Sequence, residues 1–134
     1  MTDGGRGNGT GIVSKLSPYS VDDTVTRLAD LALERGMKLF TVIDHTAEAR
    51  QAGLELRDSA LVIFGDPVAG TPVLVASPLA GLDLPFRALV WDDGGKTTIS
   101  YYDPPALIAR HQVSTSLAAY LSGIGPLTDA VVNP

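Results

Sequence analysis

The chain has 134 residues, 45% of them hydrophobic and 19% charged, which is typical of a globular domain rather than a disordered segment. Fifteen acidic and ten basic residues give a net charge of −5 at pH 7, so the chain would repel nucleic acid at long range. The absence of cysteine excludes disulfides, thiolate nucleophiles and thiolate metal sites.

The first eleven residues are glycine-rich and polar, without the apolar region of a signal peptide. We expect residues 1–11 to be a flexible leader and residues 12–134 to form a single α+β domain. Because neither a signal peptide nor a membrane segment is evident, we also expect a cytoplasmic location.

A strand and a long helix are predicted first. The strand covers residues 12–17, and the helix follows Ser20, a favourable N-cap residue with two aspartates behind it. Apolar residues then recur at helical spacing up to Gly36, which is expected to end the helix in the left-handed conformation.

The next predicted elements are a strand over residues 39–43 and a short helix over residues 46–52. The strand is apolar and β-branched, and the short helix is expected to begin at Thr46 as its cap. Asp44 and His45 lie between the two elements.

Residues 60–82 are apolar apart from Asp66 and are long enough to resemble a membrane span. Three prolines and three glycines interrupt this stretch, so a spanning helix would be broken repeatedly. We interpret it as a buried hairpin with strands over residues 60–64 and 73–76.

A second hairpin is predicted over residues 87–102, turning at the Asp-Asp-Gly-Gly sequence from Asp92. Helical pieces are expected at residues 106–111 and 116–121, with interruptions near Gly123 and Pro126. This order of elements predicts an α+β two-layer sandwich, in which helices back a mostly antiparallel sheet.

The residues from about 17 to 121 resemble the family catalogued as domain of unknown function 302. The resemblance rests on the helix from Ser20 to Gly36, the Ile43-Asp44-His45 step, Phe64-Gly65-Asp66-Pro67 with Gly70-Thr71, Leu82-Asp83-Leu84-Pro85, and Asp103-Pro104. The family often has Asn in place of Asp66. The resemblance implies a TATA-binding-protein-like fold of the β-α-β(4)-α type with extra elements, and no assigned activity. A fold shared with a DNA-binding protein carries no functional weight for this acidic chain.

Asp44 with His45 is the first candidate for chemistry. A carboxylate beside an imidazole can orient the ring and transfer protons; alternatively, Asp44 caps the following helix and His45 packs locally. Neighbouring strand residues point in opposite directions, so a direct contact between the two would require a turn.

Four further residues complete the candidate ligand-binding set. Asp66 and Asp83 lie in proline-containing turns that they can also shape structurally, whereas Phe64 and Tyr101 lie on strands where either core packing or a pocket is possible. His45 with Asp66, Asp83 or Asp103 could also assemble into an oxygen-rich divalent-metal site.

No nucleophile elbow, Walker loop or dinucleotide-binding motif is present in the sequence. We therefore expect a small-ligand-binding or interaction module, pairing with itself as a homodimer, with no cofactor and no nucleic-acid or membrane partner. The alternatives are a small enzyme that uses Asp44 and His45 for proton transfer, and a protein that binds a divalent metal weakly.

Overall fold

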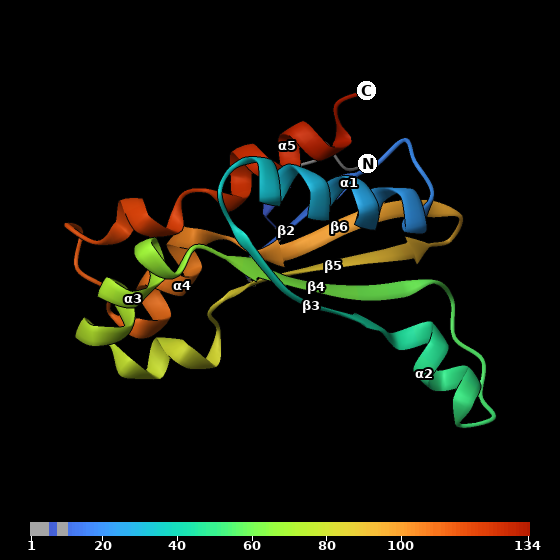
Figure 1. Ribbon diagram of the computed structural model, residues 1–134, viewed down its shortest axis with the longest axis horizontal. Coiled ribbons are helices and arrows are strands. Elements are labelled where there is room, and N and C mark those ends of the chain that lie inside the picture. Colours follow the sequence, from blue (N-terminus) through green and yellow to red (C-terminus); the bar gives the residue numbers. More distant parts are fainter. Residues whose placement is uncertain (1–5, 8–10) are drawn as a thin grey trace.

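The computed structural model describes residues 6–7 and 11–134, and Figure 1 shows how their helices and strands are arranged. In chain order the elements are β1 (Arg6–Gly7), β2 (Ile12–Leu16), α1 (Val21–Glu34), β3 (Lys38–Asp44), α2 (His45–Gln51), β4 (Ser59–Gly65), α3 (Pro67–Ala76), the 3₁₀ turn η1 (Pro78–Leu82), β5 (Phe86–Asp93), β6 (Lys96–Tyr102), α4 (Pro104–His111), the 3₁₀ turn η2 (Ala118–Leu121) and α5 (Ile124–Val132).

The strands form one antiparallel sheet in the order β1-β2-β6-β5-β4-β3. Helices α1 and α5 cover one face of this sheet, while α3, η1 and α4 gather beyond one end of the strands and α2 lies beyond the other (Figure 1). The predicted α+β sandwich, with helices backing an antiparallel sheet, is confirmed.

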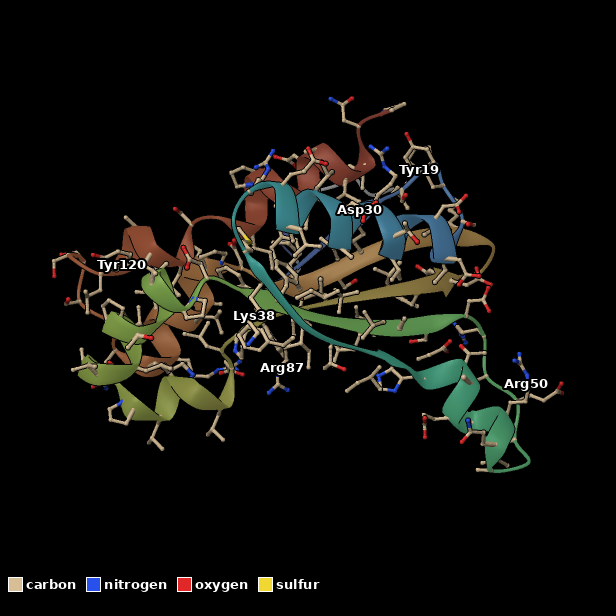
Figure 2. All side chains as sticks on the ribbon, in the orientation of Figure 1. Tyr19, Asp30, Lys38, Arg50, Arg87 and Tyr120 are labelled. Carbon is tan, nitrogen blue, oxygen red and sulfur yellow. The ribbon has the colours of Figure 1, made fainter. Side chains whose placement is uncertain are left out.

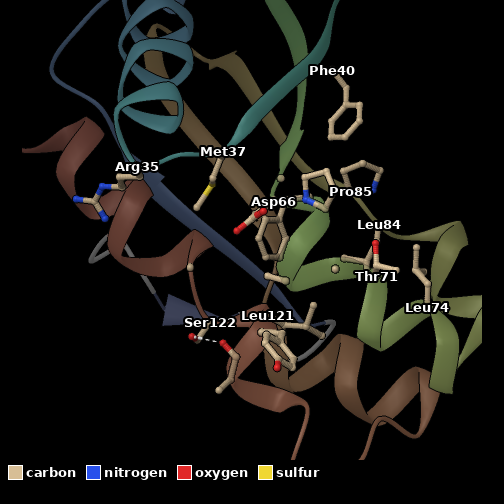
Figure 3. Close-up of a pocket in the computed structure, with 18 residues that line it drawn as sticks. Arg35, Met37, Phe40, Asp66, Thr71, Leu74, Leu84, Pro85, Leu121 and Ser122 are labelled. Carbon is tan, nitrogen blue, oxygen red and sulfur yellow. Dashed lines mark hydrogen bonds between the residues drawn. The ribbon is translucent and has the colours of Figure 1, made fainter.

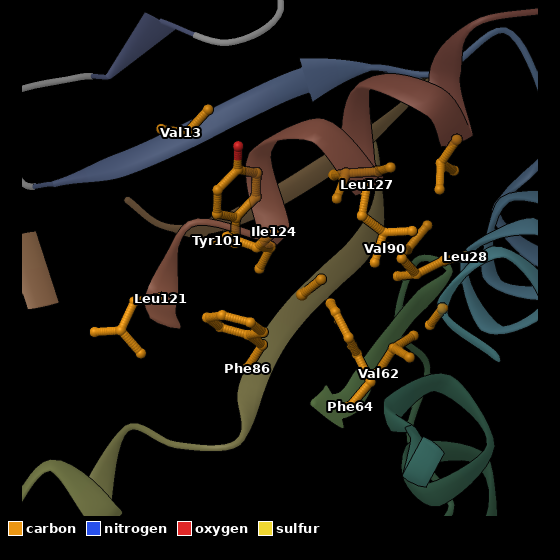
Figure 4. Close-up of a cluster of buried hydrophobic side chains, with 14 of the residues drawn as sticks. Val13, Leu28, Val62, Phe64, Phe86, Val90, Tyr101, Leu121, Ile124 and Leu127 are labelled. Carbon is orange, nitrogen blue, oxygen red and sulfur yellow. The ribbon is translucent and has the colours of Figure 1, made fainter. Parts of the chain in front are cut away.

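The hydrophobic core lies between the sheet and helices α1 and α5. Alternate residues of the central strands point into it, because neighbouring strand residues face opposite sides of a sheet. Figure 4 shows side chains from both layers meeting there, among them Val62, Val90, Leu28 and Leu127, all of which are fully buried.

Local signals at the two ends of α1 agree with the prediction. The side chain of Ser20 accepts a hydrogen bond from the backbone N–H of Asp23 at 3.1 Å, which satisfies one of the free donors of the first turn. Gly36 follows the helix with a φ of +80°, a conformation that glycine adopts without strain.

The predicted hairpin over residues 60–82 is wrong in its second half. Residues 60–64 do belong to a strand, β4, but residues 67–76 form helix α3 and residues 78–82 form η1. Asp66 caps α3, and Pro67 occupies the first helical position, where its missing N–H leaves no bond unmade. Residues 73–76 are consequently helical, and the strand that pairs with β4 on this side is β5.

Two smaller corrections concern helix boundaries. The cap of α2 is Asp44 and not Thr46, whose buried hydroxyl instead joins the backbone of Arg57 and Ser59. Residues 116–121 contain only the short η2, whereas Pro126, expected as an interruption, lies in the first turn of α5.

Most of the predicted N-terminal leader, residues 1–5 and 8–10, lies outside the described residues. Arg6 and Gly7 form the short strand β1, paired with Val13 and Ser14 of β2.

Candidate functional site

A cavity of about 510 Å³ opens where β3 and β4 meet α3, η2 and the segment that leads into β5. This volume lies within the range of roughly 300–1,000 Å³ that small-molecule sites occupy. Figure 3 shows the side chains around it. The apolar members of the wall include Met37, Phe40, Leu74, Leu84, Pro85, Phe86 and Leu121.

The end of β4 forms one wall of the cavity. Gly65 ends the strand against Pro85, and a β-carbon added at Gly65 would lie 3.3 Å from the Pro85 side chain, closer than most such contacts. Asp66 then turns the chain into α3, and its Oδ1 accepts the N–H of Val68 at 2.9 Å. The Phe-Gly-Asp-Pro sequence therefore forms a strand-to-helix turn rather than a hairpin turn.

Asp66 is the acidic residue of an otherwise mostly apolar wall. Its side chain is half-buried, and Val68 is its only hydrogen-bond partner within the described chain. The second carboxylate oxygen can thus accept a hydrogen bond from a ligand. Arg35 and Tyr120, both exposed, add a cation and a hydroxyl to the wall.

Two of the predicted site residues, Phe64 and Tyr101, do not line the cavity. Phe64 is fully buried and packs against Phe86, with ring centroids 5.9 Å apart, and Phe86 does line the cavity. Tyr101 is buried under α5, where the ammonium of Lys15 lies 5.2 Å from its ring.

Asp44 and His45 lie at the opposite end of the sheet from Asp66. In the β3–β4 register Asp44 pairs with Ala60, whereas Lys38, at the other end of β3, pairs with Gly65. The seven residues of β4, at roughly 3.3 Å each, separate the two ends by about 20 Å. The Oδ1 atom of Asp44 accepts the N–H of Ala47 at 2.9 Å and so caps α2. The structure therefore does not bring the His45–Asp66 pair of the enzyme alternative together.

Asp83 has a histidine partner that sequence reasoning missed. Its Oδ2 lies 2.6 Å from Nε2 of His111 and 3.1 Å from a guanidinium nitrogen of Arg110, both at the end of α4. Burial by itself would raise the pKa of the Asp83 carboxyl, but the hydrogen bonds from His111 and Arg110 and their charges outweigh it, and the pKa falls below its ordinary value. This cluster holds α4 against the segment that leads to Leu84 and Pro85 in the cavity wall.

Sequence reasoning also missed most of the cavity wall. Phe40 lies on β3, Met37 in the connection before it and Leu74 on α3, and each has the sequence pattern of an ordinary core residue. The exposure of Phe40, at 42%, is a property of the fold that no local pattern encodes.

Within residues 6–7 and 11–134, no cluster of three or more histidine or acidic side chains could hold a metal ion. Over the same residues, no helix is both long and apolar enough to cross a membrane.

The family model of a domain of unknown function, DUF302, matches residues 13–130. The crystal structure of an uncharacterized conserved DUF302 protein from Bacillus stearothermophilus superposes with a TM-score of 0.77 and 19% sequence identity, covering 91% of this chain and 95% of that one. This likeness supports the same fold.

Curated relatives from Brucella carry a different kind of name. The chain is 41% identical over 124 residues to proteins named fluoride-specific ion channel FluC 1 from Brucella suis biovar 1 and Brucella abortus biovar 1. The match covers 89% of this chain but 49% and 46% of those proteins. The chain thus spans about half the length of the curated relatives it matches.

Proposed function

This chain belongs to the DUF302 family, and we propose that it is a small-ligand-binding module without catalysis of its own, working as a homodimer. The observation that carries the proposal is the cavity beside Asp66, which combines a ligand-sized volume with a mostly apolar wall and few polar groups.

The composition of the wall also favours one class of ligand. Apolar side chains on several sides favour a compact apolar or aromatic body, and the free oxygen of Asp66 favours a hydrogen-bond donor or a cation. We therefore infer that the ligand is a small amphipathic molecule that places an amine or hydroxyl against Asp66.

Gly70 offers a way to block the cavity without damaging the fold. It lies on the cavity side of α3, and a β-carbon there would meet no atom within 4 Å. A Gly70→Leu substitution therefore extends into open space, and removing glycine from a helix interior favours folding. Val75, on the same helix, is 78% exposed and lies outside the cavity wall, so Val75→Leu is the matched control.

The test is a fluorescence titration with Nile red, an uncharged apolar dye, followed by competition with 2-phenylethylamine. We expect the parent and Val75→Leu proteins to bind the dye and Gly70→Leu to lose binding by more than about tenfold, since the added side chain occupies ligand volume. Failure of the parent to bind, or equal binding by Gly70→Leu, would contradict the proposal.

Asp66→Asn tests the preference for a cation. Asparagine caps helices as well as aspartate does, so α3 is retained while the negative charge is lost. We expect phenylethylamine to displace the dye less effectively from this variant than from the parent. The neutral analogue 2-phenylethanol should displace the dye equally well from both proteins.

The homodimer is supported by the outer strand of the sheet. Among the described strands, β3 has a neighbour on one side only, and Phe40, Val42 and Ile43 on it are each more than one-third exposed. A free strand edge is a template for pairing with another chain. Native mass spectrometry is expected to give a dimer that Val42→Lys weakens and that Leu54→Lys, at a more exposed apolar site outside β3, leaves intact. A strictly monomeric parent would contradict the homodimer.

The Brucella relatives favour a second candidate function. Proteins named as fluoride channels devote about half of their length to a region like this chain, so we propose that the chain can serve as an accessory domain to such a channel. The test measures fluoride release from liposomes holding the Brucella suis protein with its matched half deleted. Added chain is expected to change the rate; an unchanged rate would contradict this role.

A further inference from the structure

One surface segment, residues 67–82, is unusually apolar. It consists of α3 and η1, which we call the apolar arm, and none of its sixteen residues is charged. Among the described residues, the four most exposed large hydrophobic side chains all lie in this arm: Val68 (80%), Val75 (78%), Leu79 (73%) and Leu82 (69%). The apolar stretch that resembled a membrane span in the sequence is therefore partly exposed to solvent.

Within the part of the chain that the structure describes, the outer side of helix α3 is exposed. Its inner side lines the cavity through Pro67, Gly70 and Leu74, while Val68 and Val75, seven residues apart and hence on one face, point outward. A helix that is apolar on all sides is normally buried on all sides. The outer face of the arm is thus a surface for contact with another apolar phase.

Two exposed cations, Arg87 and Lys38, lie near the arm. Arg87 donates a hydrogen bond to the carbonyl of Leu82 at 3.1 Å and keeps its guanidinium exposed, and Lys38 pairs across the sheet with Gly65, two residues before α3. Figure 2 shows Lys38 and Arg87 beside the arm, on the side of the sheet opposite α1. Neither residue forms a salt bridge with a described carboxylate.

Two acids lie at the ends of the arm, Asp66 before it and Asp83 after it. Asp83 is held by Arg110 and His111, and Asp66 is half-buried in the cavity wall. An apolar surface with free cations at its margin complements a layer of anionic headgroups over hydrocarbon.

The size of the patch distinguishes a lipid surface from a second copy of the chain. Four aliphatic side chains provide on the order of 400 Å² of apolar surface at most, about half of the roughly 800 Å² per partner in a standard protein–protein interface. A few inserted aliphatic side chains with adjacent cations are, however, enough for reversible contact with a membrane surface.

We propose that the outer face of the apolar arm docks on an anionic lipid bilayer, with Val68, Val75, Leu79 and Leu82 inserted and Lys38 and Arg87 at the headgroup level. This surface goes beyond the proposed ligand binding and does not depend on occupancy of the cavity.

Vesicle co-sedimentation tests the proposal, using phosphatidylcholine vesicles with and without an equal part of phosphatidylglycerol. The full chain is expected to sediment with the anionic vesicles, and the Val75→Asp/Leu79→Asp variant to lose more than about tenfold in partitioning. Leu54→Asp/Leu56→Asp, at exposed apolar sites outside the arm, is the matched control and keeps binding. Arg87→Gln is expected to reduce partitioning into the anionic vesicles by about fivefold and to leave partitioning into the phosphatidylcholine vesicles unchanged.

Three results would overturn the docking proposal. The parent chain does not sediment with anionic vesicles, or the control substitutions weaken binding as much as those in the arm. The third combines two observations: the parent does not bind vesicles, and the arm variant no longer self-associates in native mass spectrometry. The arm would then be a protein interface. Nile red binding, measured on the same variants, reports separately on the cavity.

Discussion

Lys15 provides the sharpest test of how α5 is held on the sheet. The residue lies on β2 and is 4% exposed, so its ammonium is buried beneath α5. There it donates to the carbonyl of Gly125 at 3.0 Å and to Oγ1 of Thr128 at 2.6 Å, and it pairs with Asp129 at 2.8 Å. The aliphatic stem and the ammonium should therefore contribute separately, and two substitutions can separate them.

Lys15→Met keeps most of the stem and removes the ammonium. The loss of charge-assisted hydrogen bonds, at roughly 1.5–3 kcal/mol each, is partly offset because no charge has to be buried. The side chain of Asp129 is 70% exposed, so water solvates its carboxylate once the ammonium is removed. We expect a net decrease of about 1–3 kcal/mol in the free energy of unfolding. Lys15→Ala also deletes three buried methylenes, at roughly 0.8 kcal/mol each, and should cost about 3–5 kcal/mol.

Urea unfolding followed by the fluorescence of Trp91, the single tryptophan, measures both values. Trp91 lies on β5 and donates to Ser100 on the neighbouring strand at 3.0 Å, so it reports on the sheet rather than on α5 itself. Equal losses for Lys15→Met and Lys15→Ala would refute the reasoning, because the buried stem would then contribute nothing.

Other predictions follow from local geometry. The pKa of Asp83 in the folded protein lies below its ordinary value of 3.8, so its contribution to stability is present above that value and is lost as the pH falls through the lowered pKa. In urea unfolding at a series of pH values, Asp83→Asn should make the free energy of unfolding depend less on pH in this acidic range. Ser20→Ala should cost about 1 kcal/mol in the same assay through loss of the cap on α1. Gly36→Ala should cost about 1–2 kcal/mol at its φ of +80°, whereas Gly70→Ala, inside α3, should gain roughly 0.5–1 kcal/mol; thermal unfolding that moved both the same way would contradict these backbone assignments.

The sequence predicted the sheet and α1 because their signals are local. An N-cap serine, acids in the first turn and a terminal glycine define α1 within one short segment. The turn at Asp92 likewise defined the β5–β6 hairpin, in which Asp92 Oδ1 accepts the N–H of Gly95 at 2.7 Å. Such elements require no knowledge of distant residues.

Helix α3 was missed because a short apolar run does not distinguish a strand from a helix. The apolar run over residues 73–76 is compatible with a strand and proline usually interrupts a helix, but Pro72 lies inside α3. The signal that could have found the helix is Asp66 followed by Pro67, a cap residue before a proline at the first helical position.

The candidate site was only partly predictable, for a different reason. Asp66 was identified because a charge in an apolar run is conspicuous in the sequence. The partner of Asp83 was not, because His111 is 28 residues away and reaches the carboxylate through the packing of α4 near η1. Two roles were predicted for Asp44, proton transfer with the adjacent His45 and capping of the following helix, and the structure shows the cap.

The two faces of α3 are apolar for different reasons. A polar outer face would have sufficed if the helix only had to close the cavity, since a surface helix needs one apolar stripe. The outward side chains Val68 and Val75 therefore require a separate reason, which contact with lipid supplies. Gly70→Leu fills the inner side and Val75→Asp alters the outer side of the same helix, so the two variants should have opposite phenotypes. The first loses dye binding and keeps vesicle binding, and the second does the reverse. A variant that lost both would indicate that α3 moves as a unit and that cavity and surface are a single site.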